Sequence, residues 1–270
     1  MPPPGRLRED VRVNDGVVFR KGSGTAPAGY FRWEASGLAW LAAAQRGAAV
    51  AEVIAVAQDH LDLRRLSFVN PTPAMAEAFG ASLARTHDAG ASAFGAPPAG
   101  WQGHGFLGPV SQPLPLSLLP TTSWGEFYAH QRLGPALTMG VDKGLYGHSD
   151  IALFEAIGRR LARGEFDDGS APARLHGDLW SGNILWTAEG GVLIDPAAHG
   201  GHRETDLAML ALFGCPHWDF VIGGYLDHHR LDAQWPQRVA LHQLHPLMIH
   251  AVLFGGDYPR RAVQLAKRYR

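Results

Sequence analysis

The most constraining feature of the chain is the order of four polar residues around an apolar strand. His176-Gly177-Asp178 and Asn183 form the pattern H-G-D-x-x-x-x-N, and "GVLIDP" then places Asp195 at the end of the strand. Asp, Gly, Ser and Asn are also common in turns, and an aspartate before proline can simply end a strand. Taken together, the order, the spacing and the intervening strand favour a chemical role for the set.

Phosphoryl transfer requires this combination of groups. One carboxylate accepts or orients the hydroxyl proton, while an amide and a second carboxylate hold magnesium against the phosphates. Asp178 fits the first role, and Asn183 and Asp195 supply the hard oxygen ligands that Mg²⁺ prefers. Protein kinases show the same order in H-R-D-x-x-x-x-N followed by D-F-G. We expect His176 to support the loop by hydrogen bonding rather than to act as a base.

A kinase of this kind also needs a lysine on a strand, paired with a glutamate on the following helix. Lys21 ends "VVFRK", and Glu34 lies in "YFRWEASGL". The chain has only three lysines, Lys21, Lys143 and Lys267, against 21 arginines, so a lysine at this place is hard to ascribe to chance. The alternative is a solvated surface pair of no functional importance.

Composition narrows the class of protein. The 270 residues suffice for one large domain or for two lobes that share a cleft. The net charge of −1 argues against a nucleic-acid partner, and no apolar run approaches the roughly 20 residues that cross a bilayer. The single cysteine, Cys215, excludes an internal disulfide and suits a reducing cytosol. "MPPPGRLRED" has no signal-peptide pattern. We therefore expect a soluble, cytoplasmic protein without a membrane partner.

The pattern along the chain predicts an α+β fold of two lobes. Residues 11–21 suggest two strands joined by a turn at Asn14-Asp15-Gly16, residues 29–45 an amphipathic helix, and residues 48–68 two more strands. Residues 95–123 are rich in glycine and proline and predict a long loop. We expect helices around 74–90, 124–139, 148–163, 203–213, 216–229, 234–254 and 258–269. A small β-rich nucleotide-binding lobe (1–67) would precede a larger, mostly helical catalytic and substrate lobe (68–270).

Longer segments resemble the fructosamine (ketosamine) kinases, relatives of aminoglycoside and choline kinases with a protein-kinase-like fold. "HGDLWSGN" (176–183) followed by "DPAAHGGHRETDLAML" (195–210) carries the resemblance. It continues in "KGSGTAPAGYFRWEASGL" (21–38), "PTPAMAEAFGASLARTH" (71–87), "GFLGP" (105–109), "SWGEFYAHQRL" (123–133) and "LHQLHPLMIHAVLFGGDY" (241–258). It covers nearly the whole chain after the first ten or so residues.

The resemblance implies a role for each site residue. Asp178 would be the catalytic base, Asn183 and Asp195 the magnesium ligands, and Lys21 with Glu34 the phosphate-positioning pair. Leu63, Arg64, Arg65 and Leu66 would form the hinge that receives adenine through its backbone, although relatives often carry an acidic residue at the position of Arg64. Trp180 would line the substrate site or pack in the core. Glu204 would contact the substrate or brace the loop, and His176 and Asp206 would support it.

The resemblance also implies an ATP-dependent kinase that uses Mg²⁺. Its acceptor would be the 3-hydroxyl of a ketosamine such as fructoselysine or ribuloselysine, on a small glycated amine or a glycated protein lysine, and the activity would serve deglycation. One departure concerns the glycine-containing nucleotide loop of the family. "MPPPGRLRED" has one glycine and no predicted strand, so we expect either that the recorded start lies downstream of the true one or that the N-terminal lobe lacks its first strand and this loop. The alternatives are a kinase for aminoglycosides or choline, and a pseudokinase that binds without turnover.

Overall fold

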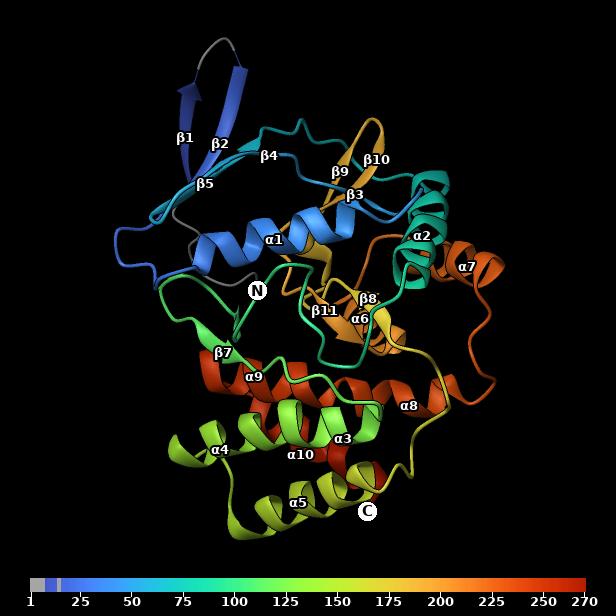
Figure 1. The fold of residues 1–270 in the computed structure, drawn as a ribbon. Coiled ribbons are helices and arrows are strands. Elements are labelled where there is room, and N and C mark those ends of the chain that lie inside the picture. The colour runs from blue at the N-terminus through green and yellow to red at the C-terminus, as the bar shows by residue number, and fades with distance from the viewer. Residues whose placement is uncertain (1–7, 14–15) are drawn as a thin grey trace.

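A small antiparallel sheet forms the N-terminal end of the molecule in the computed structural model, which describes residues 8–13 and 16–270 (Figure 1). Its strands are β1 (Arg8–Val13), β2 (Gly16–Gly22), β5 (His60–Arg64) and β4 (Val53–Val56), in the order β1-β2-β5-β4. Helix α1 (Tyr30–Ala42) lies between this sheet and the rest of the chain. Phe31 and Leu38 on one side of the helix share a hydrophobic core with Leu61 and Leu63 of β5.

The predicted N-terminal hairpin is confirmed, with one correction. Strand β1 begins at Arg8, three residues before the expected start, and pairs with β2 from Arg8 opposite Lys21 to Val13 opposite Gly16. Residues 14 and 15 of the predicted turn lie outside the described residues. The expected lack of a first strand and glycine loop stays a prediction.

A second sheet joins the two predicted lobes. Strand β3 (Ala49–Val50) pairs in parallel with β10 (Gly190–Leu193), which pairs in antiparallel fashion with β9 (Ile184–Thr187). The Ala51 amide also donates to the Leu193 carbonyl at 2.9 Å. The predicted boundary at residue 67 stays a prediction, but the chain before it contacts the hairpin that lies between Asn183 and Asp195.

Helices dominate the rest of the chain, as predicted. They are α2 (Pro73–Asp88), α3 (Trp124–Tyr128), α4 (Gly134–Asp142), α5 (His148–Ala162), α6 (Arg203–Phe213), α7 (Trp218–His228), α8 (Trp235–His242), α9 (Leu244–Phe254) and α10 (Tyr258–Ala266). Thr72 accepts a hydrogen bond from the Met75 amide, and Pro73 occupies the first turn, so α2 begins where its capping residues allow. Two short strand pairs, β6 (Gly105–Leu107) with β7 (Leu114–Leu116) and β8 (Ala173–Leu175) with β11 (His199–Gly201), lie among the helices.

Three of these predictions were wrong in detail. The predicted helix 234–254 is two helices, because Pro246 lacks the N–H that would bond to the His242 carbonyl. The Tyr128 hydroxyl instead donates to the carbonyls of Leu241 and His242, at 2.9 and 3.0 Å. The predicted helix 124–139 contains a π-helical turn at Ala129–Leu133 before α4. The predicted loop 95–123 contains the β6–β7 hairpin.

Two hydrophobic cores stabilise the helical part. One lies among α3, α4, α5, α9 and α10, and the other lies where α2 and α7 pack side by side against the β9–β10 hairpin (Figure 1). In the part of the chain that the structure describes, no helix is long and apolar enough to span a membrane.

Candidate active site

Asp178 and Asn183 lie together at the end of β8. The chain leaves this strand at Leu175, turns through Gly177, and passes through a 3₁₀ turn at Ser181–Asn183 before β9. The Asn183 amide nitrogen Nδ2 donates to the backbone oxygen of Asp178 at 2.7 Å and to its carboxylate Oδ2 at 3.1 Å. This contact orients the Asp178 carboxylate, as a residue that must face a substrate hydroxyl requires.

His176 fixes the loop from inside the protein. The Asp178 amide donates to His176 Nδ1 at 3.2 Å, so the ring carries its proton on Nε2 and donates to the Ile194 carbonyl at 2.9 Å. Burial lowers the pKa of His176, which keeps the ring neutral and in this tautomer. The single side chain therefore links the loop of Asp178 to the residue before Asp195.

Asp206 holds the same loop from the start of α6. Its carboxylate accepts hydrogen bonds from the amides of His176 and Gly177, at 2.7 and 3.0 Å, and from His87 Nε2 at 3.2 Å. Burial alone would raise the pKa of Asp206, but the hydrogen bonds from His87 and from the His176 amide outweigh it and lower the pKa. The structure thus places Asp206 under the loop, in the supporting position that the sequence suggested.

Asp195, Lys21 and Glu34 meet although they are far apart in sequence. Lys21 Nζ lies 2.5 Å from Glu34 Oε2 and 2.8 Å from Asp195 Oδ1. Burial alone would lower the pKa of Lys21, but the charges of Asp195 and Glu34 outweigh it and raise the pKa, so the amine stays charged. Asp195 has φ 54, a left-handed conformation that turns the chain directly after β10.

An apolar cavity opens beside these residues. It is lined by Phe19, Ala51, Leu63, Arg64, Arg65, Leu66, Phe68, Leu185, Ile194 and Asp195. All four predicted hinge residues belong to this lining, and Asp195 connects the cavity to the charged groups. A cavity lined mainly by apolar side chains, here called the slot, suits a purine base.

Several residues of this slot were not predicted from the sequence. Phe19 precedes Lys21 by two positions on β2, so the two side chains point to the same face of the sheet. Ile194 directly precedes Asp195, and Leu185 follows Asn183 by two positions. The alternation of side chains along a strand could therefore have identified Phe19 as a residue of the slot. The Arg64 side chain points elsewhere, because its guanidinium pairs with Glu52 at the exposed surface.

Trp180 lies next to the loop that carries Asp178. The side chain is half-buried, and a Cβ added at Gly182 would come within 2.1 Å of the Trp180 ring, so the indole covers this glycine. Only glycine allows so close an approach. Trp180 therefore has an exposed portion beside the proposed base, which is compatible with the substrate wall that the sequence suggested.

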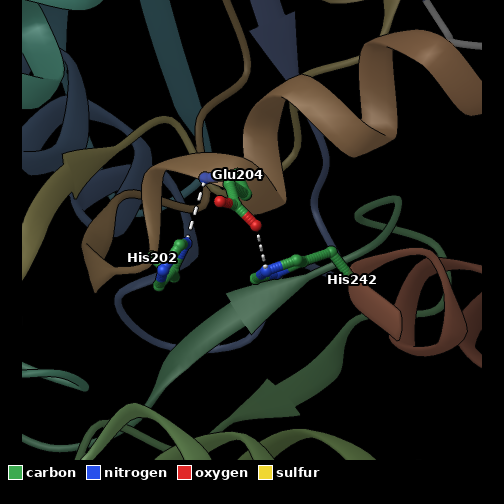
Figure 2. A group of neighbouring side chains, drawn as sticks. All are labelled: His202, Glu204 and His242. Atoms are coloured by element: carbon green, nitrogen blue, oxygen red, sulfur yellow. Dashed lines mark hydrogen bonds and ion pairs between the residues drawn. The ribbon is translucent and has the colours of Figure 1, made fainter. Parts of the chain in front are cut away.

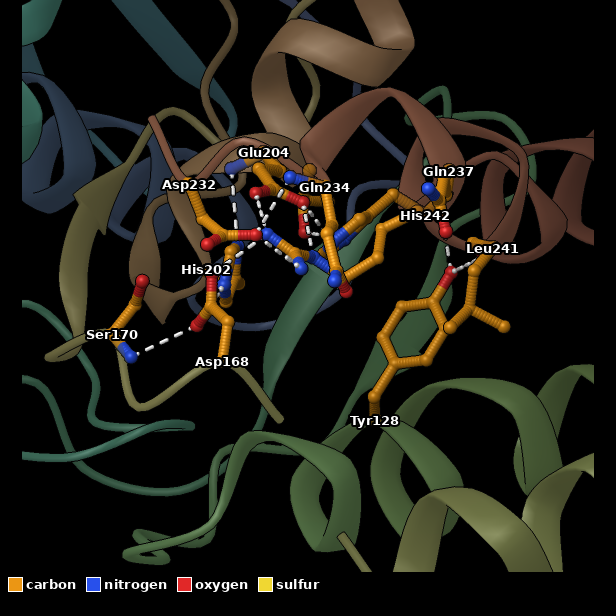
Figure 3. Close-up of polar contacts among 12 residues, drawn as sticks. Tyr128, Asp168, Ser170, His202, Glu204, Asp232, Gln234, Gln237, Leu241 and His242 are labelled. Carbon is orange, nitrogen blue, oxygen red and sulfur yellow. Dashed lines mark hydrogen bonds and ion pairs between the residues drawn. The ribbon is translucent and has the colours of Figure 1, made fainter. Parts of the chain in front are cut away.

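Glu204 lies in a buried ion-pair network instead of an open position. Arg238 donates to both carboxylate oxygens of Glu204, at 2.9 and 2.6 Å, and the glutamate is only 1% exposed. Figures 2 and 3 show His202 and His242 on either side of it, with Asp168 and Asp232 nearby. The carboxylate is thus covered by its partners, and the structure corrects the expectation of a substrate contact in favour of the bracing alternative.

His202, Glu204 and His242 have ligand-type atoms within 4.8 Å of one another. Each histidine already has partners: His202 Nδ1 accepts from the Glu204 amide, and His242 Nδ1 bonds to the Thr205 hydroxyl at 2.9 Å. A divalent cation would have to compete with the Arg238 guanidinium, which donates to both Glu204 oxygens. We therefore interpret the group as an ion-pair network that joins α6 to α8.

Asn183 and Asp195 fit a magnesium ion better. Both offer oxygen ligands, they lie on either side of the β9–β10 hairpin, and the Ile194 amide donates to the Asn183 carbonyl at 3.1 Å, which holds the two ends of the hairpin together. Mg²⁺ takes only one or two protein carboxylates beside phosphates and water. The pair of donors, of which Asp195 also lines the slot, matches that requirement.

Comparison with known protein sequences places this chain in a family. A sequence profile of the fructosamine kinases matches residues 7–269. A probable ketoamine kinase of Synechocystis sp. is 36% identical over 194 residues, which cover 70% of this chain and 60% of the relative. This chain thus matches less than two thirds of the length of that relative.

Solved structures agree with this assignment. A crystal structure from Thermobifida fusca, described as a "putative fructosamine-3-kinase", is 44% identical with a TM-score of 0.85, and the match covers 94% of this chain and 85% of that one. A choline kinase from Streptococcus pneumoniae is 13% identical with a TM-score of 0.58, over 99% of this chain and 92% of the other, and shares the fold. The two-lobed, protein-kinase-like α+β fold that the sequence predicted is confirmed.

Proposed function

The chain belongs to the fructosamine kinase family, and from this premise we propose that it transfers the γ-phosphoryl group of ATP to the 3-hydroxyl of a ketosamine. The observation that carries the proposal is the convergence of Lys21, Glu34 and Asp195 at an apolar slot. Asp178 and Asn183 lie at the same open end of the β9–β10 hairpin as Asp195, where Leu193 pairs with Ile184 and the Ile194 amide donates to the Asn183 carbonyl. Fructoselysine and ribuloselysine are the acceptors that we propose.

The slot would receive the adenine ring of ATP. Phe19, Leu185 and Ile194 offer apolar surface, and the backbone of Leu63–Leu66 offers the hydrogen-bonding groups of a hinge. The phosphates would then lie beside Lys21, whose charged amine is held in place by Glu34. Mg²⁺ held by Asp195 and Asn183 would neutralise charge that develops on the phosphates.

Asp178 would act on the acceptor hydroxyl. Its carboxylate takes the hydroxyl proton while the acceptor oxygen forms a bond to the γ-phosphorus. The bond from the γ-phosphorus to the bridging oxygen breaks at the same time, and ADP leaves with that oxygen. Asn183 Nδ2 keeps the carboxylate oriented, and His176 and Asp206 keep the loop in place.

The acceptor chemistry fits a site with an aromatic wall. A ketosamine carries a secondary amine, usually cationic, beside several hydroxyls. The partly exposed indole of Trp180 offers a π face for such a cation within two residues of Asp178. Phosphate at the 3-position leaves readily and frees the amine, so the transfer would serve deglycation of small amines or of protein lysines.

Two rival functions make different predictions. An aminoglycoside carries several ammonium groups and needs a broad acidic surface, whereas Glu204, one of the acidic residues after Asp195, is covered by Arg238. A choline kinase would need the aromatic site but no contacts for sugar hydroxyls. A pseudokinase would bind ATP and transfer nothing.

A substrate panel separates these functions. The purified chain is incubated with Mg-ATP and fructoselysine, ribuloselysine, kanamycin or choline, and ADP release and phosphorylated product are measured. We expect product with a ketosamine and little or none with kanamycin or choline. Asp178→Asn, purified in parallel, controls for contaminating kinases. More efficient phosphorylation of kanamycin or choline than of both ketosamines would contradict the proposal, and ATP binding without any product would favour the pseudokinase.

A further inference from the structure

Helix α1 is attached to two hydrophobic cores at opposite ends of the molecule. Phe31 and Leu38 pack in the core of the N-terminal sheet. Trp33, on the same helix and 2% exposed, belongs to the core of the helical part together with Leu107 and Leu116 of the β6–β7 hairpin. Since Glu34 directly follows Trp33, the position of the glutamate depends on both attachments.

Two side chains of the first helical turn bind the backbone of the hairpin segment. Trp33 Nε1 donates to the Phe106 carbonyl, and the Tyr30 hydroxyl donates to the Gly108 carbonyl, each at 2.9 Å. Residues three apart lie on one face of a helix, so both bonds attach the same face of α1. The Tyr30 ring also contacts the Phe106 ring at 5.5 Å between centroids.

The glycines of "GFLGP" make this contact possible. A Cβ added at Gly105 would lie 2.5 Å from the Trp33 indole, so any other residue would push the ring away. Gly108 has φ 85, a conformation that favours glycine, and it presents its carbonyl to Tyr30. The "GFLGP" segment therefore forms the surface to which two aromatic side chains of α1 bind.

The hairpin is in turn fixed to the C-terminal helices. Leu107 and Leu116 pack with Leu247 and Met248 of α9, and a Cβ at Gly108 would lie 3.3 Å from the Leu253 side chain. Figure 1 shows β7 next to α9. The hairpin thus provides a fixed support for α1 rather than a loose loop.

The start of α1 is held by Phe31 in the core of the N-terminal sheet and by the bonds of Tyr30 and Trp33 to the hairpin segment. Its N-cap is Gly29, which has no side chain to bond to the first amides, so no side-chain cap contributes to fixing this end of the helix. The next attachment lies beyond Glu34, where Gly37 approaches Pro196 so closely that a Cβ would be 3.1 Å from the proline ring. Glu34 therefore lies between the hairpin contact and a contact to the residue after Asp195.

We propose that the β6–β7 hairpin clamps helix α1 and thereby holds Glu34 against Lys21, with Trp33 and Tyr30 as positioning residues. The inference rests on the proposed function in one respect, that Lys21 and Glu34 orient the phosphates. The clamp would keep this pair formed before substrate binds, so the C-terminal helices set the position of a group in the nucleotide site.

Trp33→Phe tests the clamp with little loss of apolar volume. It removes the bond to the Phe106 carbonyl, and we expect kcat to fall about tenfold while the Michaelis constant of the acceptor changes less than threefold. Trp40→Phe is the matched control, because Trp40 lies on the same helix and contacts Arg174 instead of the hairpin. We expect its kcat to stay within twofold of the wild type.

A double-mutant cycle shows whether Trp33 acts through Glu34. Glu34→Gln removes the charge that pairs with Lys21 and should itself lower kcat. If the clamp acts by holding Glu34, then Trp33→Phe adds little to the loss in the Glu34→Gln background. An equal further loss in both backgrounds would overturn the proposal, since a general effect on folding or stability does not depend on the charge at position 34.

Hydrogen exchange of the α1 amides tests the clamp without any substrate. We expect Trp33→Phe and Gly105→Ala each to speed exchange of these amides several-fold, and Trp40→Phe to leave it unchanged. Tyr30→Phe, the mildest change, should give a smaller increase. Unchanged exchange in both Trp33→Phe and Gly105→Ala would overturn the clamp. A wild-type chain that phosphorylates no ketosamine would remove the proposed function, while the exchange result would still decide the clamp.

Discussion

The molecule contains two clusters in which carboxylates surround one basic side chain. In the proposed nucleotide site Lys21 contacts Glu34 and Asp195, and in the helical part Arg238 contacts Asp168, Glu204 and Asp232. Asp195 also lines an apolar slot, and its side chain is 14% exposed. Arg238 and His242 both contact the Glu204 carboxylate, and the glutamate is only 1% exposed.

The difference shows that a group of charged side chains does not by itself indicate a reaction. Both clusters have short contacts and lowered carboxylate or raised cation pKa values, because any buried charge needs a partner. Asp168, Asp232 and Arg238 border a second cavity, but the buried Glu204 is not part of its lining, whereas Asp195 lines the apolar slot. We therefore expect substitutions in the first cluster to change activity, and substitutions in the second to change stability.

The largest expected effect is on turnover. Asp178→Asn removes the group that accepts the hydroxyl proton, and loss of a general base lowers kcat by about 10²- to 10⁴-fold. Nucleotide affinity and the melting temperature should stay close to those of the wild type. Steady-state kinetics, calorimetry with Mg-ATP and thermal unfolding measure the three quantities. Near-normal turnover would remove Asp178 from this role.

The next effect is on stability. Glu204→Gln leaves Arg238 with one charged partner fewer in a buried position, which we expect to lower the free energy of unfolding by about 3 kcal/mol. The kcat of the folded protein should change less than threefold. Glu155→Gln is the control, because Glu155 pairs with Arg159 at the exposed surface, where such pairs contribute less than about 1 kcal/mol. Loss of turnover without loss of stability in Glu204→Gln would reverse the assignment of the two clusters.

A smaller effect appears as a pH dependence of stability. Burial lowers the pKa of His242 to about 4, despite the neighbouring Glu204, whereas the unfolded chain has the ordinary value of 6.5. Between pH 4 and pH 6.5 the unfolded state therefore binds more protons at this position than the folded state does. The contribution of His242 to the free energy of unfolding is thus fully present above pH 6.5 and is lost as the pH falls toward 4. At pH 5 the loss from this group should be about 2 kcal/mol. Urea unfolding at pH 7.5 and pH 5 should show a smaller difference for His242→Gln than for the wild type.

The smallest effect concerns the acceptor. Trp180→Ala removes a partly exposed π face beside Asp178, and we expect the Michaelis constant of the ketosamine to rise about five- to tenfold. The Michaelis constant of ATP provides the internal control and should change less than twofold. Equal changes for both substrates would indicate that Trp180 packs in the core and distorts the whole site when removed.

The sequence pointed to the residues that meet in the proposed nucleotide site because these residues follow a fixed order along the chain. The pattern from His176 to Asp195 and the placement of Lys21 on a strand each required only local spacing. The apolar side of the slot was harder to predict. Phe19 and Ile194 cannot be told from other apolar strand residues by local sequence, and only the packing of the strands brings them into the slot. Pairing between distant strands depends on tertiary structure.

Glu204 shows where local patterns fail. It lies in the same motif as Asp206, two residues away, yet its partner Arg238 is 34 residues further along the chain. Nothing in the motif tells whether a helix start faces a cleft or another helix. The break between α8 and α9 had a visible cause in Pro246, but the Tyr128 hydroxyl that accommodates it comes from α3, so only the folded chain shows why the break is tolerated.

The left-handed backbone of Asp195 makes stability and activity favour the same residue at a single position. Residues other than glycine are destabilised by about 1 kcal/mol in this conformation, and aspartate and asparagine tolerate it best. Glycine would remove this strain, but it would also remove the carboxylate that pairs with the largely buried Lys21, and the loss of one partner from such a pair costs about 3 kcal/mol. A library screened for heat resistance should therefore retain the aspartate at position 195, as should a screen for catalysis.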